Sequence, residues 1–201
     1  MAAVIVKQEN VIAAYQAASD EGKALLKALF PSVVEEQPKE EDVLPIHDTR
    51  KDIKERIKTF EDACTWHGVD PEALKNLWEA QRMMPDEVAY QKLRLIVSAL
   101  NEGWEPAFTT NEWRYYPWHY LYTQTKIDEM ATEEQHERCT MSLEDYKTEG
   151  WAGFACASSN YAPSRTSALL GSRLCLKNRE LATYCGTQFI RLWADFKLIR
   201  K

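Results

Sequence analysis

Gly171-Ser172-Arg173-Leu174-Cys175-Leu176-Lys177-Asn178 is the stretch of this chain that decides the fold. Leucines alternate with other residues there, which predicts a short β-strand over residues 167–176. Asn178 is a favoured N-cap residue, so a helix is expected to begin at once and to run to about residue 198. One side of that helix carries Leu181, Cys185, Phe189, Leu192 and Phe196. A strand followed directly by an amphipathic helix predicts a small sheet that the closing helix covers.

Two more strands are expected upstream of this stretch. Residues 113–123 are rich in aromatic side chains, which favour pleated, half-buried surfaces, and residues 150–159 form a second candidate. Pro117 cannot donate to a ladder, so the aromatic strand lies at an edge of the sheet or bends there. Between the two, residues 126–138 are polar and acidic and predict a short surface helix.

The first half of the chain is predicted to be helical. A helix is expected over residues 10–30, with Ser19 to Gly22 as a point of division. Another is expected over 48–67, with Ile53, Ile57, Phe60 and Cys64 on one face. Asp70-Pro71 and Pro85 open the next two helices, the second of which turns Leu93, Ile96, Val97 and Leu100 to the core before Gly103 stops it. The fold class is therefore α+β, with a helical N-terminal half and a small antiparallel sheet packed by a C-terminal helix.

The domain boundaries follow from a charged, proline-broken run over residues 34–42. We expect a helical segment over 1–34, an acidic linker over 35–47 and one α+β domain over 48–201.

Composition excludes several classes of function. The chain of 201 residues is 45% apolar and 28% charged, with no apolar run of the roughly 20 residues that cross a bilayer. Its start lacks the features of a signal peptide, so a cytoplasmic location is expected, with no membrane partner. The five cysteines include no Cys-x-x-Cys pair and the four histidines lie far apart, so no metal site is expected.

No catalytic constellation is recognisable either. The chain has no P-loop and no Gly-x-Gly-x-x-Gly, so no cofactor and no catalytic residue is predicted. A Cys156–His119 pair would be needed for nucleophilic catalysis, but no flanking motif supports it. Glu133, Glu134 and Glu137 are typical of a solvated helix face.

Charge is unevenly distributed. From Arg165 to the end there are eight basic and two acidic residues, a net +6, so residues 1–164 carry −12 of the total of −6. A basic end on an acidic protein can attract phosphates, or it can pair with the acidic half of its own chain.

Two blocks carry a family resemblance over roughly residues 85–201. One runs from Lys92 to Trp104 and continues in Tyr115-Tyr116-Pro117-Trp118, and the other runs from Gly171 through Glu180-Leu181-Ala182 to Asp195-Phe196. In these the chain resembles a family of proteins from phages and mobile elements of gut Bacteroidales. The resemblance implies a phage or prophage origin and carries over no catalytic residue.

The candidate binding site is the start of the closing helix, because helix N-termini attract anions. Arginines and a lysine lie beside it, and a segment over 158–167, expected to be a loop, adds hydroxyls, an amide and a ring. The predicted ligand-binding residues are Arg165, Arg173, Lys177, Asn178, Arg179, Ser158, Ser159, Asn160, Tyr161 and Trp118. Arginines and Lys177 would contact phosphate, and Tyr161 and Trp118 would stack on a base.

The leading interpretation is a non-enzymatic phage accessory protein that binds a nucleotide or a nucleic acid and counters host defence. Two simpler interpretations stay open for the site: Asn178 only caps the helix, and the aromatic block only fills the core. The alternative function is a virion or assembly protein that makes only protein–protein contacts, through a partner or as a homo-oligomer.

Overall fold

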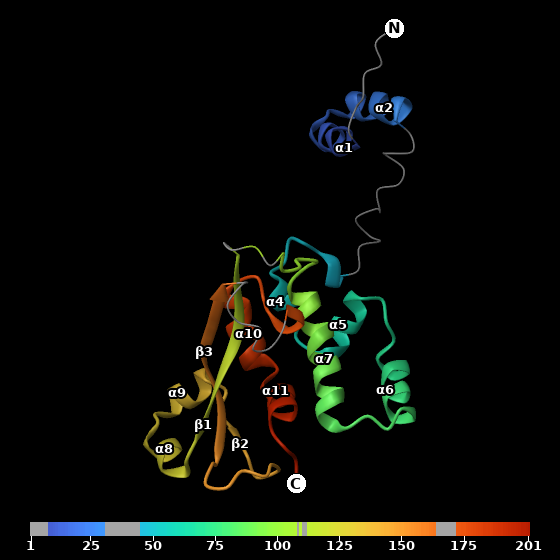
Figure 1. Ribbon diagram of the computed structural model, residues 1–201. Coiled ribbons are helices and arrows are strands. Elements are labelled where there is room, and N and C mark those ends of the chain that lie inside the picture. The colour runs from blue at the N-terminus through green and yellow to red at the C-terminus, as the bar shows by residue number, and fades with distance from the viewer. Residues whose placement is uncertain (1–7, 31–44, 108, 110–111, 164–171) are drawn as a thin grey trace. The chain divides into compact units, whose positions relative to one another are not determined.

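The computed structural model describes residues 8–30, 45–107, 109, 112–163 and 172–201 (Figure 1). The chain divides into two compact units, Met1–Asp48 and Thr49–Lys201.

The first unit contains two helices of ten residues each, α1 (Gln8–Ala17) and α2 (Asp20–Leu29), and the 3₁₀ turn η1 (Pro45–His47). The helix predicted over 10–30 is thus divided, at the position where division was anticipated. Ser19 is the reason, because its side chain accepts a hydrogen bond from the Gly22 N–H and so starts α2 as an N-cap.

The second unit opens with α4 (Ile53–Arg56), α5 (Phe60–Trp66), α6 (Pro71–Ala80) and α7 (Pro85–Leu100). The single helix predicted over 48–67 is wrong. Thr59 and Asp62 form a capping box, in which each side chain accepts from the backbone of the other, and this starts α5 as a separate helix. The four apolar residues predicted to share a face are nevertheless all buried: Ile53, Ile57, Phe60 and Cys64.

The predicted starts of α6 and α7 and the predicted end of α7 are confirmed. Asp70 caps α6 with Pro71 as its first residue, and Pro85 opens α7. The predicted core face of α7 is at most 1% exposed: Leu93, Ile96, Val97 and Leu100. The chain turns away beyond Asn101 and adopts positive φ at Glu102 (51°) and Gly103 (82°).

The sheet is antiparallel in the order β1–β3–β2, from β1 (Trp113–Tyr122), β2 (Met141–Ser142) and β3 (Gly153–Pro163). β1 lies at the edge, as Pro117 predicted, and its register shifts between Trp118 and His119. Two short helices, α8 (Gln124–Glu129) and α9 (Thr132–Glu137), join β1 to β2.

Two expectations about the strands are corrected. β3 extends to Pro163, so Ser158 to Tyr161 lie in a strand and not in a loop. The strand predicted over 167–176 is wrong where the structure describes it, since η2 (Ser172–Leu174) is a 3₁₀ turn and Leu176 makes one isolated bridge to Tyr115. Leu174, Cys175 and Leu176 are all fully buried. Three consecutive side chains of this segment therefore lie in the core, whereas the side chains of a sheet strand point alternately to its two faces.

The closing helix is two helices, α10 (Arg179–Gln188) and α11 (Ile190–Lys197), which meet at Phe189. The break turns Trp193 and Ala194 into the core, while Leu192 and Phe196 are only partly buried. α10 packs on β1 and β3, and α11 packs on α7, so both helices lie between the sheet and α7 (Figure 1). The fold is α+β, with a helical N-terminal half and a small antiparallel sheet packed by C-terminal helices. Among the helices described, none has the length and apolar character that a membrane crossing requires.

Candidate ligand-binding site

The side chain of Asn101 fastens the end of α7 to the segment that precedes α10. Its Nδ2 donates to the Cys175 carbonyl at 2.9 Å, and its Oδ1 accepts from the Lys177 N–H at 3.1 Å. Leu176 is held on the other side, where it exchanges backbone hydrogen bonds of 2.9 and 3.1 Å with Tyr115. The segment therefore lies between α7 and β1, and Arg173 is brought beside α7.

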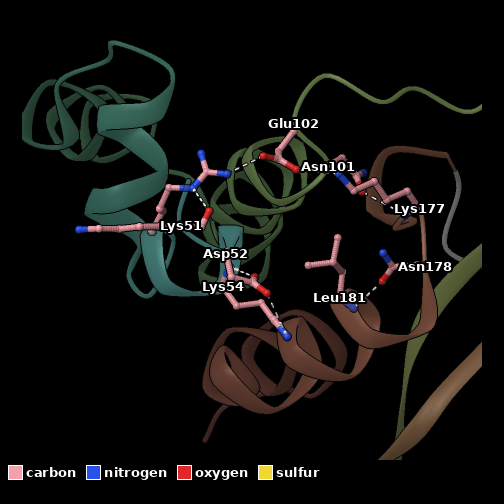
Figure 2. A network of polar contacts seen from close by, with 9 residues as sticks. Lys51, Asp52, Lys54, Asn101, Glu102, Lys177, Asn178 and Leu181 are labelled. Atoms are coloured by element: carbon pink, nitrogen blue, oxygen red, sulfur yellow. Dashed lines mark hydrogen bonds and ion pairs between the residues drawn. The ribbon is translucent and has the colours of Figure 1, made fainter. Parts of the chain in front are cut away.

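Glu102 lies between two cations at the same junction (Figure 2). Arg56 donates to its Oε1 at 2.6 Å and Lys177 to its Oε2 at 2.8 Å. Lys177 is the main cause of a lowered pKa at the Glu102 carboxyl, and Arg56 adds to it against the opposing effect of burial. This ion pair joins the basic C-terminal part of the chain to its acidic half, as one of the two charge interpretations anticipated.

A pocket of about 360 Å³ lies beside this junction. Three parts of the chain form it: α7, the residues that follow α7, and η2. The lining residues are Arg94, Val97, Ser98, Asn101, Trp104, Glu105, Pro106 and Arg173.

The α7 residues of the pocket share one face of the helix, because they recur at intervals of three and four. Val97 and Asn101 are buried and form its floor, whereas Arg94 and Ser98 are exposed. The amide of Asn101 is already committed to Cys175 and Lys177, so the polar groups that α7 offers to a ligand come from Arg94 and Ser98.

Arg94 and Arg173 give the pocket two guanidinium groups. Within the described part of the chain neither forms an ion pair. Arg94 makes only a 3.4 Å hydrogen bond to Gln91 and lies 5.9 Å from the centroid of the Tyr90 ring. A guanidinium fork matches the oxygens of phosphate, and the Trp104 ring beside it supplies a stacking surface.

Among the predicted ligand-binding side chains that the structure describes, only that of Arg173 lies in this pocket. The ammonium of Lys177 is engaged by Glu102, and Asn178 caps α10, accepting from the Leu181 N–H at 2.8 Å (Figure 2). Arg179 is the exposed first residue of α10. The N-terminus of α10 thus has the simple capping arrangement that was held as the alternative.

Trp118 is not among the pocket residues, and the remaining predicted residues lie wholly or partly outside the described structure. Trp118 is 39% exposed on β1, with its ring 6.3 Å from that of Tyr120 in an edge-on arrangement. The backbones of Ser158, Ser159, Asn160 and Tyr161 pair with β1, and their side chains lie outside the described part of the structure, as does Arg165 altogether.

Arg94, Ser98 and Trp104 were missed by sequence reasoning. Their signal was present, since Arg94 and Ser98 are four residues apart beside the apolar stripe of α7, and Trp104 follows the glycine that ends the helix turn. Nothing in the sequence says that Arg173, 79 residues beyond Arg94, faces them.

The geometry does not support a Cys156–His119 catalytic pair. The two residues are register partners, but the His119 Nε2 contacts the Gly186 carbonyl at 3.3 Å, and Lys197 donates to its Nδ1 at 3.0 Å. Burial, assisted by the Lys197 charge, lowers the pKa of His119 to about 3, so the ring is a poor base. Among the described residues, no three His, Cys, Asp or Glu side chains could hold a metal ion together.

Comparisons of the chain with models of protein families, with curated proteins and with solved structures found no match.

Proposed function

We propose that the protein is a non-enzymatic phage accessory protein that binds an anionic ligand, a nucleotide or a nucleic acid, in the pocket between α7 and η2. The observation that carries the proposal is that Arg94, Arg173 and the ring of Trp104 line one pocket. In the described structure neither guanidinium group forms an ion pair. Charge-assisted bonds from arginine and stacking on tryptophan suit the two ends of a nucleotide.

Size and charge favour a nucleotide over a long nucleic acid. A volume of about 360 Å³ lies at the small end of the range of ligand pockets. The net charge of −6 repels an extended polyanion at long range, whereas one or two phosphates are governed by the local arginines. In the cytoplasm of a host cell, a phage protein of this kind would sequester a nucleotide signal and so counter host defence.

The test is a thermal-shift screen of the full chain against nucleotides, cyclic dinucleotides and short oligonucleotides, followed by calorimetric titration of the hits. A ligand at 100 times its Kd stabilises the fold by about 2.7 kcal/mol. Arg94→Ala and Arg173→Ala should each weaken binding by about 10- to 100-fold, since each removes a charge-assisted contact. Both side chains are exposed, so the melting temperature of the free protein should change little.

Arg191→Ala is the matched control. Arg191 is an equally charged, exposed side chain whose nearest carboxylate, Asp145, is 3.5 Å away, and it takes no part in the pocket. Its removal should leave the affinity unchanged. The proposal would be overturned if no ligand of the panel raised the melting temperature, or if Arg191→Ala lost as much affinity as Arg94→Ala and Arg173→Ala.

One observation favours the alternative of a virion or assembly protein. Trp118, Tyr120 and Tyr122 form a row of edge-on rings along β1, at centroid distances of 6.3 and 6.2 Å, and Tyr120 is 50% exposed. Exposed aromatic rows often mark protein contacts. This function predicts assembly that rises with protein concentration. A variant with Trp118→Ser and Tyr120→Ser should lose that assembly, whereas Arg173→Ala should retain it. Light scattering on these variants distinguishes an assembly protein from a nucleotide-binding protein.

A further inference from the structure

The pocket between α7 and η2 carries a carboxylate as well as its two guanidinium groups. Glu105 is exposed, and within the described residues it forms no ion pair, with Arg94, Arg173 or any other cation. Glu102, three residues earlier, differs because Arg56 and Lys177 already neutralise it. Opposite charges therefore line one pocket without pairing, and a ligand that satisfies both must itself have an anionic end and an end rich in hydrogen-bond donors.

The carboxylate residue directly follows the residue that carries the stacking ring. Trp104, Glu105 and Pro106 are consecutive and all line the pocket. A proline restricts the backbone of the residue before it to extended conformations, which limits the directions in which the Glu105 side chain can leave the backbone, and Glu105 lines the same pocket as Trp104. A flat ring stacked on Trp104 would then present its edge to the Glu105 carboxylate.

Hydrogen-bond chemistry selects among the bases. An ionised carboxylate only accepts, through two oxygens. Guanine has two adjacent donors, N1–H and the N2 amino group, which match those two oxygens. Adenine places the lone pair of N1 beside its N6 amino group, so one carboxylate oxygen would meet another acceptor. The pyrimidines likewise lack two adjacent donors on that edge.

We infer that the pocket selects guanine nucleotides, with the base between Trp104 and Glu105 and the phosphate at Arg94 and Arg173. The inference rests on the proposed nucleotide-binding function and specifies its ligand. Asn101 is not a base reader, because its amide is committed to the backbone of Cys175 and Lys177.

The experiment is a set of calorimetric titrations of the full chain with GMP, IMP and AMP, and with cyclic di-GMP and cyclic di-AMP. GMP should bind about 10- to 100-fold more tightly than AMP, the effect of losing one charge-assisted contact and facing one unpaired acceptor. IMP, which lacks only the N2 amino group, should lie between them. The same order is expected for the two cyclic dinucleotides.

Glu105→Gln provides the decisive variant. A glutamine amide offers one acceptor and one donor, so the variant should lose its preference for guanine and bind AMP at least as well as GMP. Glu79→Gln, an exposed glutamate on α6, is the control and should retain the wild-type order.

The outcomes separate the two claims. Equal affinity for guanine and adenine nucleotides, with both lost in Arg173→Ala, overturns the guanine inference and leaves the proposed function standing. An unchanged guanine preference in Glu105→Gln overturns the inference as well. No binding by any of the five ligands overturns the guanine inference, whereas the proposed function is overturned only if the wider panel of nucleotides and oligonucleotides also fails to bind.

Discussion

Asn101 shows how one side chain positions two distant segments. It bonds the Cys175 carbonyl and the Lys177 N–H, more than 70 residues away, and is itself only 5% exposed. The Cys175 carbonyl has no water to replace Asn101, since Cys175 is fully buried, and the Lys177 N–H bond is partly buried. The residue therefore matters for stability and for the position of Arg173.

Asn101→Ala should lower the free energy of unfolding by about 2–4 kcal/mol, because two buried or partly buried backbone groups lose their partner. Urea denaturation measures this directly. Asn178→Ala, which removes only the α10 cap, serves as the comparison and should cost about 1 kcal/mol. If both variants lowered the free energy of unfolding by the same small amount, Asn101 would contribute no more than a helix cap.

His119 gives the protein a predictable response to acid. Its pKa falls from 6.5 to about 3 on folding, chiefly through burial of the ring and then through the nearby Lys197 charge. Between these two values the unfolded chain binds a proton that the folded chain does not, so the free energy of unfolding decreases as the pH falls. The loss from pH 7 to pH 5 should be about 2 kcal/mol, a range in which ordinary carboxyls stay ionised.

Urea denaturation of the wild type and of His119→Gln at both pH values tests this. The variant has no group to titrate at that position and should show a much flatter dependence. Its lower overall stability does not affect the comparison, since only the difference between the two pH values counts. A slope as steep as that of the wild type would assign the acid response to other residues.

At the scale of elements, α10 is seated on the sheet at a point where only glycine fits. A Cβ at Gly186 would lie 2.6 Å from the Cys156 Sγ and 2.7 Å from the Pro117 Cβ, both far inside normal contact. The α10 backbone therefore approaches β1 and β3 closely, and the His119 contact with the Gly186 carbonyl depends on that approach.

Gly186→Ala should lower the free energy of unfolding by about 1–3 kcal/mol through overpacking, although alanine favours a helix by up to about 1 kcal/mol over glycine. Thermal or urea denaturation shows whether the free energy of unfolding of Gly186→Ala is lower or higher than that of the wild type. Adding Cys156→Ala removes one of the two clashing atoms and should recover part of the loss. An increase in stability in Gly186→Ala would mean that α10 lies farther from the sheet than described.

The starts of α6 and α7 and the end of α7 could be predicted, because the chemistry that begins and ends these helices is local. Asp70, Pro71, Pro85 and Gly103 act through their own backbone and their immediate neighbours. The expected strand over 167–176 failed for the opposite reason. Leu174 to Leu176 are held by α7 and by Tyr115, contacts that no local pattern reports.

At the scale of the whole molecule, the second unit carries nearly all of the described core. Val11 is the one buried apolar residue described before Ile53, and every residue of the pocket belongs to Thr49–Lys201. The second unit should therefore fold and bind without the first.

A chain that begins at Thr49 should retain the melting temperature of the full protein within a few degrees and the same nucleotide affinity. Differential scanning calorimetry and calorimetric titration measure the two quantities. The full chain is the reference. Failure of the shortened chain to fold, or a loss of affinity comparable to that of Arg173→Ala, would show that the first unit contributes to the core or to the pocket.

The sequence by itself determined the α+β class, the starts of α6, α7 and α10, the edge position of β1 and the apolar face of α7. These depend on periodicity, proline chemistry and capping, which act over a few residues. Tertiary structure alone decided which basic residues face a pocket. Arg173 lines the same pocket as Arg94 because Asn101 holds two distant segments of the chain together. Lys177 forms an ion pair with Glu102 because the turn after α7 directs that carboxylate towards it. Both are long-range contacts, whose partners no local pattern identifies.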